Sequence, residues 1–552
     1  MSPNTEAPAS SLPSTPRPAP TSSPTAVPRV AKKIPGLRFP LPVYSFRPWV
    51  KLGHPIRLFE YLLKTYGKIA QYRFMGTSIV FLNDPGYIQQ VLVTDAQHFV
   101  KERTVRRMKV LIGEGLITSE DPIHKRQRRI AAPAFHRQRI AAYGDQIVSI
   151  AQSHRDQWQP GQHVDIAAAS MALSLEIVAR TLFDTDVTPD IRAINDEVNT
   201  IMHLYNFIVA FPRIESFLHL PIPGIVKFRN SKARLDAVVN RLIAEHRKAA
   251  TRGEPGGEKS GGDLLSMLLS STYEPTDVEA LPYSTKASPT ETKTSPRSSE
   301  ASPTEAKASP RRTEGLSVGL QPHESSSPQK GALAAGLSST QPERMSDDQV
   351  RDEVLTIFLA GYETVANALT WTWYLLSQNP EAEAKLHAEL DTVLGTGHQQ
   401  RLPTLADYPS LRYTEQVFAE SMRLYPPAWA MGRMSTREIH LGPYNIPAGA
   451  HVFFSQYIMS RTPEYFPDPL RFDPDRFTPE AKAARPKFTY FPFGGGSRQC
   501  IGESFAWMEG VFSIATIAQR WRMTYLGATP PIPQAKITLR PRDPLIMQLI
   551  PR

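Results

Sequence analysis

The chain has a single cysteine, Cys500, in a setting that suits binding of a metal ion. It follows the glycine-rich segment 493–499 (Phe-Gly-Gly-Gly-Ser-Arg-Gln) and stands at the start of a predicted helix. Backbone N–H groups in such a position stabilise an anionic sulfur, and glycines let these donors come close. Phe493 is placed to shield the sulfur from water, and Arg498 to bind an anionic group of the same ligand. We therefore predict a buried, metal-ligating thiolate; the alternative is an inert core cysteine.

A second segment that suggests chemistry is Ala360-Gly361-Tyr362-Glu363-Thr364, in the middle of a long predicted helix. The flanking residues are apolar on most faces, so we expect this helix to be buried. A glycine, an acid and a hydroxyl together in a buried helix indicate a functional interruption, because threonine can bond back to a carbonyl and open the helix. The alternative is a merely weakened helix with Glu363 in solvent.

These segments resemble the cytochrome P450 family. Five residues fill every fixed position of its haem-ligand signature F-x-x-G-x-R-x-C-x-G: Phe493, Gly496, Arg498, Cys500 and Gly502. The resemblance covers roughly residues 35–272 and 345–552. It implies the family's fold, mainly α with a small β portion, in which haem b (iron protoporphyrin IX) lies between the long central helix and the cysteine loop.

The resemblance also implies roles for individual residues. Glu363 and Thr364 match the family's A-G-x-[DE]-T segment, which activates oxygen and delivers protons, and Gly361 leaves room over the iron. His124 stands where the family has a tryptophan, a departure that keeps a ring N–H donor. The residues expected to bind the cofactor are Cys500, which ligates the iron, and Arg498, Phe493, Gly361, His124, Arg128 and Arg433.

Glu420 and Arg423 form an i,i+3 pair, which by itself is a common helix-surface feature. They resemble the family's E-x-x-R pair, completed by Arg476 in the segment Pro-Asp-Arg-Phe at 474–477. The role implied for these three residues is structural, since they hold the core that presents the thiolate.

The elements that must position these residues are mostly helices. Apolar alternation predicts a hairpin over 69–82 with its turn at Gly76, and strands over 442–444 and 450–454. The sequence lacks the βαβ alternation of a dinucleotide-binding fold, so it does not predict one. Helices are predicted over residues 84–93, 122–130, 142–157, 170–182, 191–211, 232–249, 263–269, 346–377, 380–394, 413–424 and 501–519.

Two segments, 1–34 and about 273–344, are dominated by Ser, Thr, Ala, Pro, Lys and Glu. The second contains a tandem repeat, because residues 287–297 recur at 301–311 with nine of eleven positions identical. Neither segment can bury enough apolar surface to offset its ordering entropy. We predict a disordered arm at 1–34 and a single domain over 35–552, interrupted by a low-complexity insertion. The alternative for the insertion is a docking tail or a linker between domains.

The composition narrows the class of protein further. One cysteine excludes an internal disulfide framework and any multi-cysteine zinc or iron–sulfur site. No apolar run of about 18 residues is long enough to span a bilayer, and no signal peptide is visible. We therefore expect a cytoplasmic monomer with no membrane span and no nucleic-acid partner. The net charge of +10 includes Lys125, Arg126 and Arg129, which by the resemblance belong to a basic face for an acidic electron donor.

The resemblance implies a monooxygenase that activates dioxygen with electrons from a separate redox partner, such as a ferredoxin and its reductase. Its substrate would be an apolar small molecule, for example a fatty acid, a terpenoid or a steroid, that is hydroxylated or epoxidised. Two alternatives stay open: a peroxide-dependent oxygenase or isomerase on the same scaffold, and a non-enzymatic haem sensor or carrier. Apolar residues at the family's substrate-contact locations lie at 110–112, 116–117, 207–211, 428–431 and 545–547.

Overall fold

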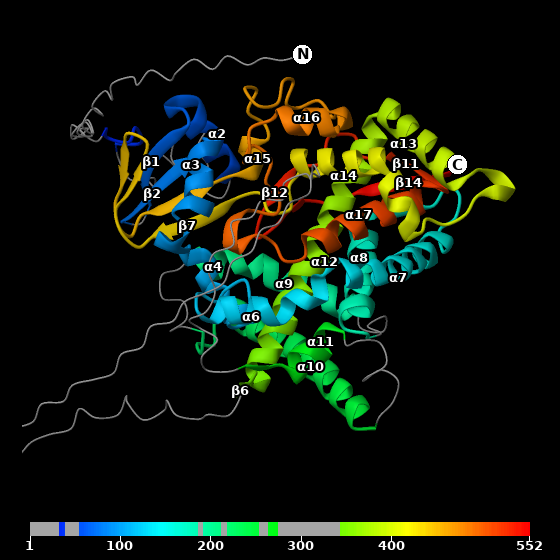
Figure 1. The fold of residues 1–552 in the computed structure, drawn as a ribbon, viewed down its shortest axis with the longest axis horizontal. Coiled ribbons are helices and arrows are strands. Elements are labelled where there is room, and N and C mark those ends of the chain that lie inside the picture. Colours follow the sequence, from blue (N-terminus) through cyan, green and yellow to red (C-terminus); the bar gives the residue numbers. More distant parts are fainter. Residues whose placement is uncertain are drawn as a thin grey trace, which may run out of the picture. The chain divides into compact units, whose positions relative to one another are not determined.

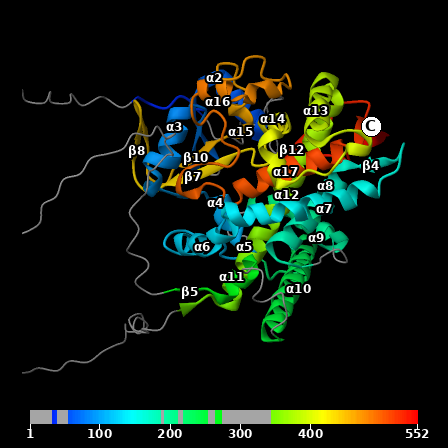
Figure 2. The same cartoon turned by 45° about the vertical axis from the view of Figure 1, so that its right-hand side comes forward.

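Helices dominate the structure, a computed structural model, and the strands form several small sheets (Figures 1 and 2). The structure describes residues 32–38, 55–74, 76–185, 191–210, 218–252, 263–273 and 343–552. Residues 1–31 of the predicted arm (1–34) and 274–342 of the predicted insertion (about 273–344) lie outside these residues. The end of the predicted arm is ordered, because the Lys32 N–H donates to the Pro443 carbonyl at 2.7 Å and Ile34 is buried. The mainly α architecture with a small β portion is confirmed.

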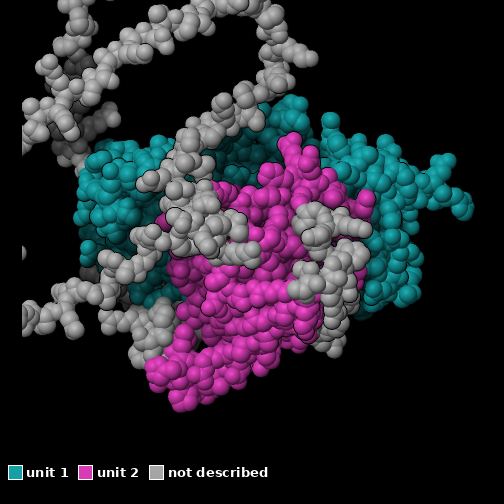
Figure 3. Space-filling view, turned by 60° about the horizontal axis from the view of Figure 1, so that its bottom comes forward, with its two compact units in different colours: residues 1–107, 147–174, 362–552 teal, residues 108–146, 175–361 magenta. Residues whose placement is uncertain are grey.

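The chain divides into two compact units, shown in teal and magenta in Figure 3. Unit 1 comprises residues 1–107, 147–174 and 362–552, and unit 2 comprises 108–146 and 175–361. Three of the four divisions fall inside helices, namely α7 (Arg137–Asp156), α8 (Ile166–Leu182) and α12 (Asp347–Gln378), and the fourth falls between Arg107 and Met108.

Unit 1 contains a five-stranded sheet in the order β1-β2-β10-β7-β3. The predicted hairpin is confirmed, because β1 and β2 pair antiparallel and Gly76 between them has a φ of +79°. That left-handed conformation favours glycine in the turn. The strand β10 runs parallel to β2 and antiparallel to β7. The strands are β1 (Ile69–Phe74), β2 (Thr77–Leu82), β3 (Phe99–Lys101), β7 (Met431–Ser435) and β10 (His451–Phe454).

One predicted strand is wrong. Residues 442–444 lie mostly in the turn between two short antiparallel strands, β8 (Ile439–Leu441) and β9 (Tyr444–Ile446). Gly442 has a φ of +56°, which a strand does not accommodate.

The remaining strands of unit 1 form two smaller sheets. One has the order β11-β14-β4, and the other pairs β12 with β13. The bounds are β4 (His163–Asp165), β11 (Trp521–Tyr525), β12 (Pro533–Ala535), β13 (Leu539–Pro541) and β14 (Ile546–Pro551).

The helices of unit 1 include one that begins three residues after Cys500. Helix α14 (Arg412–Leu424) packs against α17 (Glu503–Ala518), where Phe418 lies against Gly510 and stacks edge-on with Trp507 at 5.6 Å. The other helices that lie wholly in this unit are α2 (Pro55–Tyr66), α3 (Pro85–Gln89), a π-helix (Gln90–Thr94), α4 (Arg103–Arg107), α13 (Pro380–Leu394), α15 (Gln456–Met459) and α16 (Pro479–Ala484).

In the described part of unit 2, helices are joined by one short antiparallel strand pair, β5 (Thr272–Tyr273) with β6 (Glu343–Arg344). Helix α9 packs along α10, and α11 packs against both α6 and α10. The bounds are α5 (Lys109–Ile112), α6 (Ile123–Ala131), α9 (Ile191–Ala210), α10 (Pro223–Arg252) and α11 (Leu264–Ser270).

The long helix α12 forms as predicted. Ser346 and Gln349 cap its start reciprocally: the Gln349 N–H donates to Ser346 Oγ at 3.3 Å, and the Ser346 N–H donates to Gln349 Oε1 at 2.9 Å. Asp347 and Asp348 follow in the first turn, where the helix dipole favours acids. In the described ranges no helix combines the length and the hydrophobicity that crossing a bilayer requires.

Candidate functional site

Cys500 ends a loop that folds back on itself in unit 1. The Cys500 N–H donates to the Phe493 carbonyl at 2.9 Å, and the Gln499 N–H to the Gly496 carbonyl at 3.1 Å. The Cys500 thiol is exposed where the loop ends, and α17 begins at Glu503. The ring of Phe493 packs near Trp507, with ring centroids 5.9 Å apart.

Glycine is required in this loop because the chain lies directly on its neighbours. Gly496 has a φ of +70°, and a Cβ there would lie 2.0 Å from the carbonyl oxygen of Leu92 in the π-helix. At Gly494 a Cβ would meet only the methyl end of Met431, at 3.2 Å. The backbone at Gly496 therefore fixes where the loop carries Cys500.

Two of the predicted cofactor-binding cations belong to the same unit. Arg498 lies half-buried in a 3₁₀ turn, Gly496–Arg498, within the loop itself. Arg433 lies half-buried on β7, two residues after the Met431 that approaches Gly494. It is paired across the sheet with Lys101, which is buried, and its Nη1 donates to the Gly432 carbonyl at 2.9 Å.

The predicted oxygen-activation segment is the half-buried part of α12. Between Asp352 and Leu376 every residue of the helix is buried except Ala360, Gly361 and Thr364. A Cβ at Gly361 would lie 3.1 Å from Val178 of α8. Glycine at this position lets two helices approach closely.

Glu363 is buried and held by residues that the sequence did not suggest. Its Oε1 accepts a hydrogen bond from Thr538 Oγ1 at 2.6 Å and forms a hydrogen-bonded ion pair with Arg540 Nη2 at 2.8 Å. Asn367, one turn further along α12, donates to the Glu363 carbonyl at 2.8 Å and to Thr538 Oγ1 at 3.3 Å. Arg540 lies on β13, 177 residues away in the chain, and no local pattern links it to the helix.

His124 and Arg128 lie one turn apart on α6 in unit 2. His124 is buried, with Nδ1 3.5 Å from Asp121 Oδ1, and Arg128 is half-buried. Of the apolar segments predicted near the substrate, 110–112 and 116–117 are in unit 2, and 428–431 and 545–547 are in unit 1. The side chains of 207–211 lie outside the described residues.

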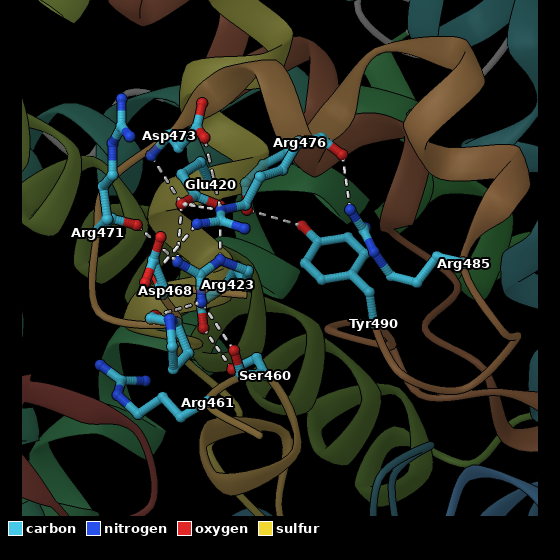
Figure 4. Close-up of polar contacts among 12 residues, drawn as sticks. Glu420, Arg423, Ser460, Arg461, Asp468, Arg471, Asp473, Arg476, Arg485 and Tyr490 are labelled. Carbon is cyan, nitrogen blue, oxygen red and sulfur yellow. Dashed lines mark hydrogen bonds and ion pairs between the residues drawn. The ribbon is translucent and has the colours of Figure 1, made fainter. Parts of the chain in front are cut away.

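The three residues predicted to be structural meet in one buried network of unit 1 (Figure 4). Arg423 and Glu420 are fully buried and joined by two hydrogen bonds, of 2.6 and 2.7 Å. Glu420 also accepts from the Asp473 N–H at 2.9 Å and lies 3.6 Å from Arg476 Nε. Arg423 donates further to three backbone carbonyls, those of Ser460, Pro469 and Arg471, at 2.7 to 3.1 Å.

Comparisons with known proteins give one family and several curated relatives. The family described as "Cytochrome P450" matches residues 35–288 and 321–549. "Cyclooctatin synthase" of Streptomyces melanosporofaciens is 33% identical over 486 residues, 87% of each chain. "Cyclooctat-9-en-7-ol 5-monooxygenase" of the same organism is 30% identical over 502 residues, 88% of this chain and 92% of the relative. "Pentalenene oxygenase" of Streptomyces avermitilis is 28% identical over 477 residues, 86% and 88% of the two chains.

The fold is also that of a solved structure. The crystal structure of the cytochrome P450DA heme domain superposes with a TM-score of 0.72, covering 95% of this chain and 99% of that one. The sequences are 21% identical, so this likeness bears on the fold alone.

Proposed function

This chain belongs to the cytochrome P450 family and is an oxidoreductase of the monooxygenase type, and we propose that Cys500 is the thiolate ligand of its haem iron. The observation that carries the proposal is the exposed Cys500 on a loop whose position depends on Gly496. An exposed sulfur on a fixed backbone is accessible to a planar cofactor.

The residues around the loop fit haem b, which carries two carboxylates. Arg498 and Arg433 are cations in the same unit as Cys500, one in the loop and one on the strand beside it. Guanidinium groups bind carboxylates through two parallel hydrogen bonds. We assign both arginines to the propionates, together with His124 and Arg128, and Phe493 to shielding of the thiolate.

When bound, a thiolate-ligated haem iron supplies reductive activation of dioxygen. The residues of α12 manage the protons. Thr364 is the half-buried hydroxyl next to Glu363 and is assigned to hold a proton at Oγ1. Both donors to Glu363 bind Oε1, so Oε2 is the oxygen assigned to proton transfer.

The substrate and the redox partner are the finer parts of the proposal. The printed names of three relatives concern cyclooctatin, cyclooctat-9-en-7-ol and pentalenene, and these favour a terpenoid over a fatty acid or a steroid. We propose that a ferredoxin with its reductase supplies electrons and docks on the basic residues of α6, of which Lys125 and Arg129 are exposed. A monomeric, cytoplasmic enzyme completes the proposal.

The test is the spectrum of the reduced protein with carbon monoxide. We expect the strongly red-shifted Soret band of a thiolate-ligated haem, and its loss in Cys500→Ser. The matched control is Ser497→Ala, an exposed hydroxyl in the same loop, which keeps the band. A correctly folded wild-type protein that binds haem without this band would refute the proposal.

Measurement of turnover with different electron sources distinguishes the monooxygenase from the peroxide-dependent alternative. We expect product from pentalenene or a related terpenoid with NAD(P)H, a ferredoxin and its reductase, and only a minor rate with hydrogen peroxide alone. Thr364→Ala is expected to keep haem binding but to divert electrons to peroxide. Equal rates from peroxide and from the redox partners would favour the alternative.

A further inference from the structure

The loop formed by residues 113–119, here called the anchor loop, is held on α12 by two consecutive acids. The Glu114 N–H donates to Asp352 Oδ2 at 2.7 Å, and the Leu116 N–H donates to Glu353 Oε2 at 3.1 Å. Asp352 is 8% exposed and Glu353 is 1% exposed. The other oxygen of Asp352 accepts from Arg351 Nη2 at 2.5 Å, which fixes the carboxylate in its orientation. Two charge-assisted hydrogen bonds therefore tie the loop to one side of the helix.

Steric contact sets the register of the anchor loop. Gly113 has a φ of +62°, and a Cβ there would lie 2.0 Å from the Asp352 carboxylate. At Gly115 a Cβ would lie 2.1 Å from Thr356 Oγ1, one turn further along α12. Side chains at these two positions would push the loop away, so its backbone rests directly on the helix. A shift by one residue would bring Glu114 against Asp352 or Thr356.

On its other side the anchor loop is bound to α6 by Gln127. The carboxamide of Gln127 is buried, donates to the Glu114 carbonyl at 2.6 Å and accepts from Ser119 Oγ at 2.5 Å. Gln127 lies between His124 and Arg128, which we assigned to the haem propionates. The loop thus joins two helices that we assign to the active site.

We infer that Asp352 and Glu353 are positioning residues for the substrate site, because they hold the anchor loop in the one register that presents Leu116 and Ile117. Leu116 is 8% exposed and Ile117 is half-buried, and both belong to an apolar segment that we expect to contact substrate. The inference rests on the proposed function. While both acids hold the loop, Leu116 and Ile117 form a fixed apolar wall of the substrate site, which discriminates apolar ligands by size. Without the acids these two side chains can move, and the discrimination is lost.

The first measurement is hydrogen exchange of single amides in the haem-loaded protein. Asp352→Ala is expected to speed exchange at the Glu114 amide, and Glu353→Ala at the Leu116 amide, by about tenfold or more each. Glu353→Gln keeps the shape and an acceptor oxygen and is expected to restore protection. The matched control is Asp348→Asn, an exposed acid on the first turn of the same helix, which leaves both amides unchanged.

The second measurement separates positioning from mere stability. Imidazole and 1-phenylimidazole are titrated as haem-binding probes, and their dissociation constants are taken from the shift of the Soret band. In either alanine variant we expect weaker binding of 1-phenylimidazole by about threefold or more, with imidazole changed much less, since only the larger probe needs the apolar wall. Glu353→Gln is expected to match the wild type for both probes.

The outcomes distinguish the two proposals. A wild-type protein without the thiolate-type carbon monoxide band refutes the proposed function, whatever the exchange rates are. A normal wild-type spectrum with unchanged amide exchange in the variants overturns the anchor. Faster exchange with an equal change for both probes also overturns it, because the loop would then have no part in size discrimination. The two acids are scored at separate amides, so either variant suffices if the other fails to fold.

Discussion

Arg423 and Arg476 approach the same carboxylate, but their removal should have very different costs. Arg423→Met takes away both of its hydrogen bonds to the fully buried Glu420 and leaves that charge with the Asp473 N–H and the weaker contact to Arg476. Breaking a buried pair in this way costs about 3–5 kcal/mol. Three backbone carbonyls also lose their Arg423 donor, at about 1 kcal/mol each. The sum of about 6–8 kcal/mol is a large part of the roughly 5–15 kcal/mol by which a native protein is stable.

Arg476→Met removes much less. Its Nε lies 3.6 Å from Glu420, beyond hydrogen-bond distance, and its Nη2 makes one hydrogen bond, to the Asp468 carbonyl at 3.1 Å. The Arg423 pair of Glu420 stays intact. We expect a loss of about 1–2 kcal/mol, since a charge contact without a hydrogen bond adds little beyond the single bond.

The assay is urea unfolding followed by far-UV circular dichroism, together with the yield of soluble, haem-loaded protein. Arg423→Met is expected to accumulate poorly or to unfold at low urea, and Arg476→Met to unfold slightly earlier than the wild type. Arg471→Met is the control, because that exposed residue enters the network through its backbone, whose carbonyl accepts from Arg423 and whose N–H donates to the Asp468 carbonyl. Equal losses for the Arg423 and Arg476 variants would show that hydrogen-bond geometry does not decide the cost.

Three further outcomes are expected. Burial raises the pKa of Glu509 to about 8, so the folded state holds a proton that the unfolded state releases at lower pH. The free energy of unfolding should therefore fall by about 1.4 kcal/mol per pH unit between roughly pH 4.5 and 8. In urea titrations at several pH values, Glu509→Gln should remove this part of the pH dependence. Gly496→Ala should abolish the soluble haem-loaded protein, whereas Gly494→Ala, which meets only a flexible methionine, should cost about 1 kcal/mol; similar yields would argue against the loop contact. Arg540→Met should lower the free energy of unfolding by about 3 kcal/mol, and adding Glu363→Gln should recover part of it, because the unpaired buried charge is then gone; no recovery would contradict the pairing.

Local patterns predicted the parts of the fold that depend on local interactions. The start of α12 was identified from Ser346 and the acids that follow it, and the hairpin from its alternation around Gly76. Helix α2 (Pro55–Tyr66) was not predicted, although Pro55 at its start and the buried spacing of Ile56, Phe59 and Leu62 give an adequate signal.

The missing parts of the site depend on contacts between distant segments. The sequence around Glu363 does not predict its ion pair with Arg540, because a three-residue strand such as β13 is too short for its pattern to be recognised or placed.

The pair of β5 and β6 has a consequence for protein engineering. Thr272 lies opposite Arg344 and Tyr273 opposite Glu343, so Tyr273 and Glu343 lie side by side although 69 residues separate them in the sequence. Paired residues of antiparallel strands have Cα atoms about 4.5–5.5 Å apart. A foreign domain whose own termini lie close together can therefore be spliced between Tyr273 and Glu343 without pulling the two strands apart. An electron-donor domain could be inserted at this position, inside the chain rather than at its end.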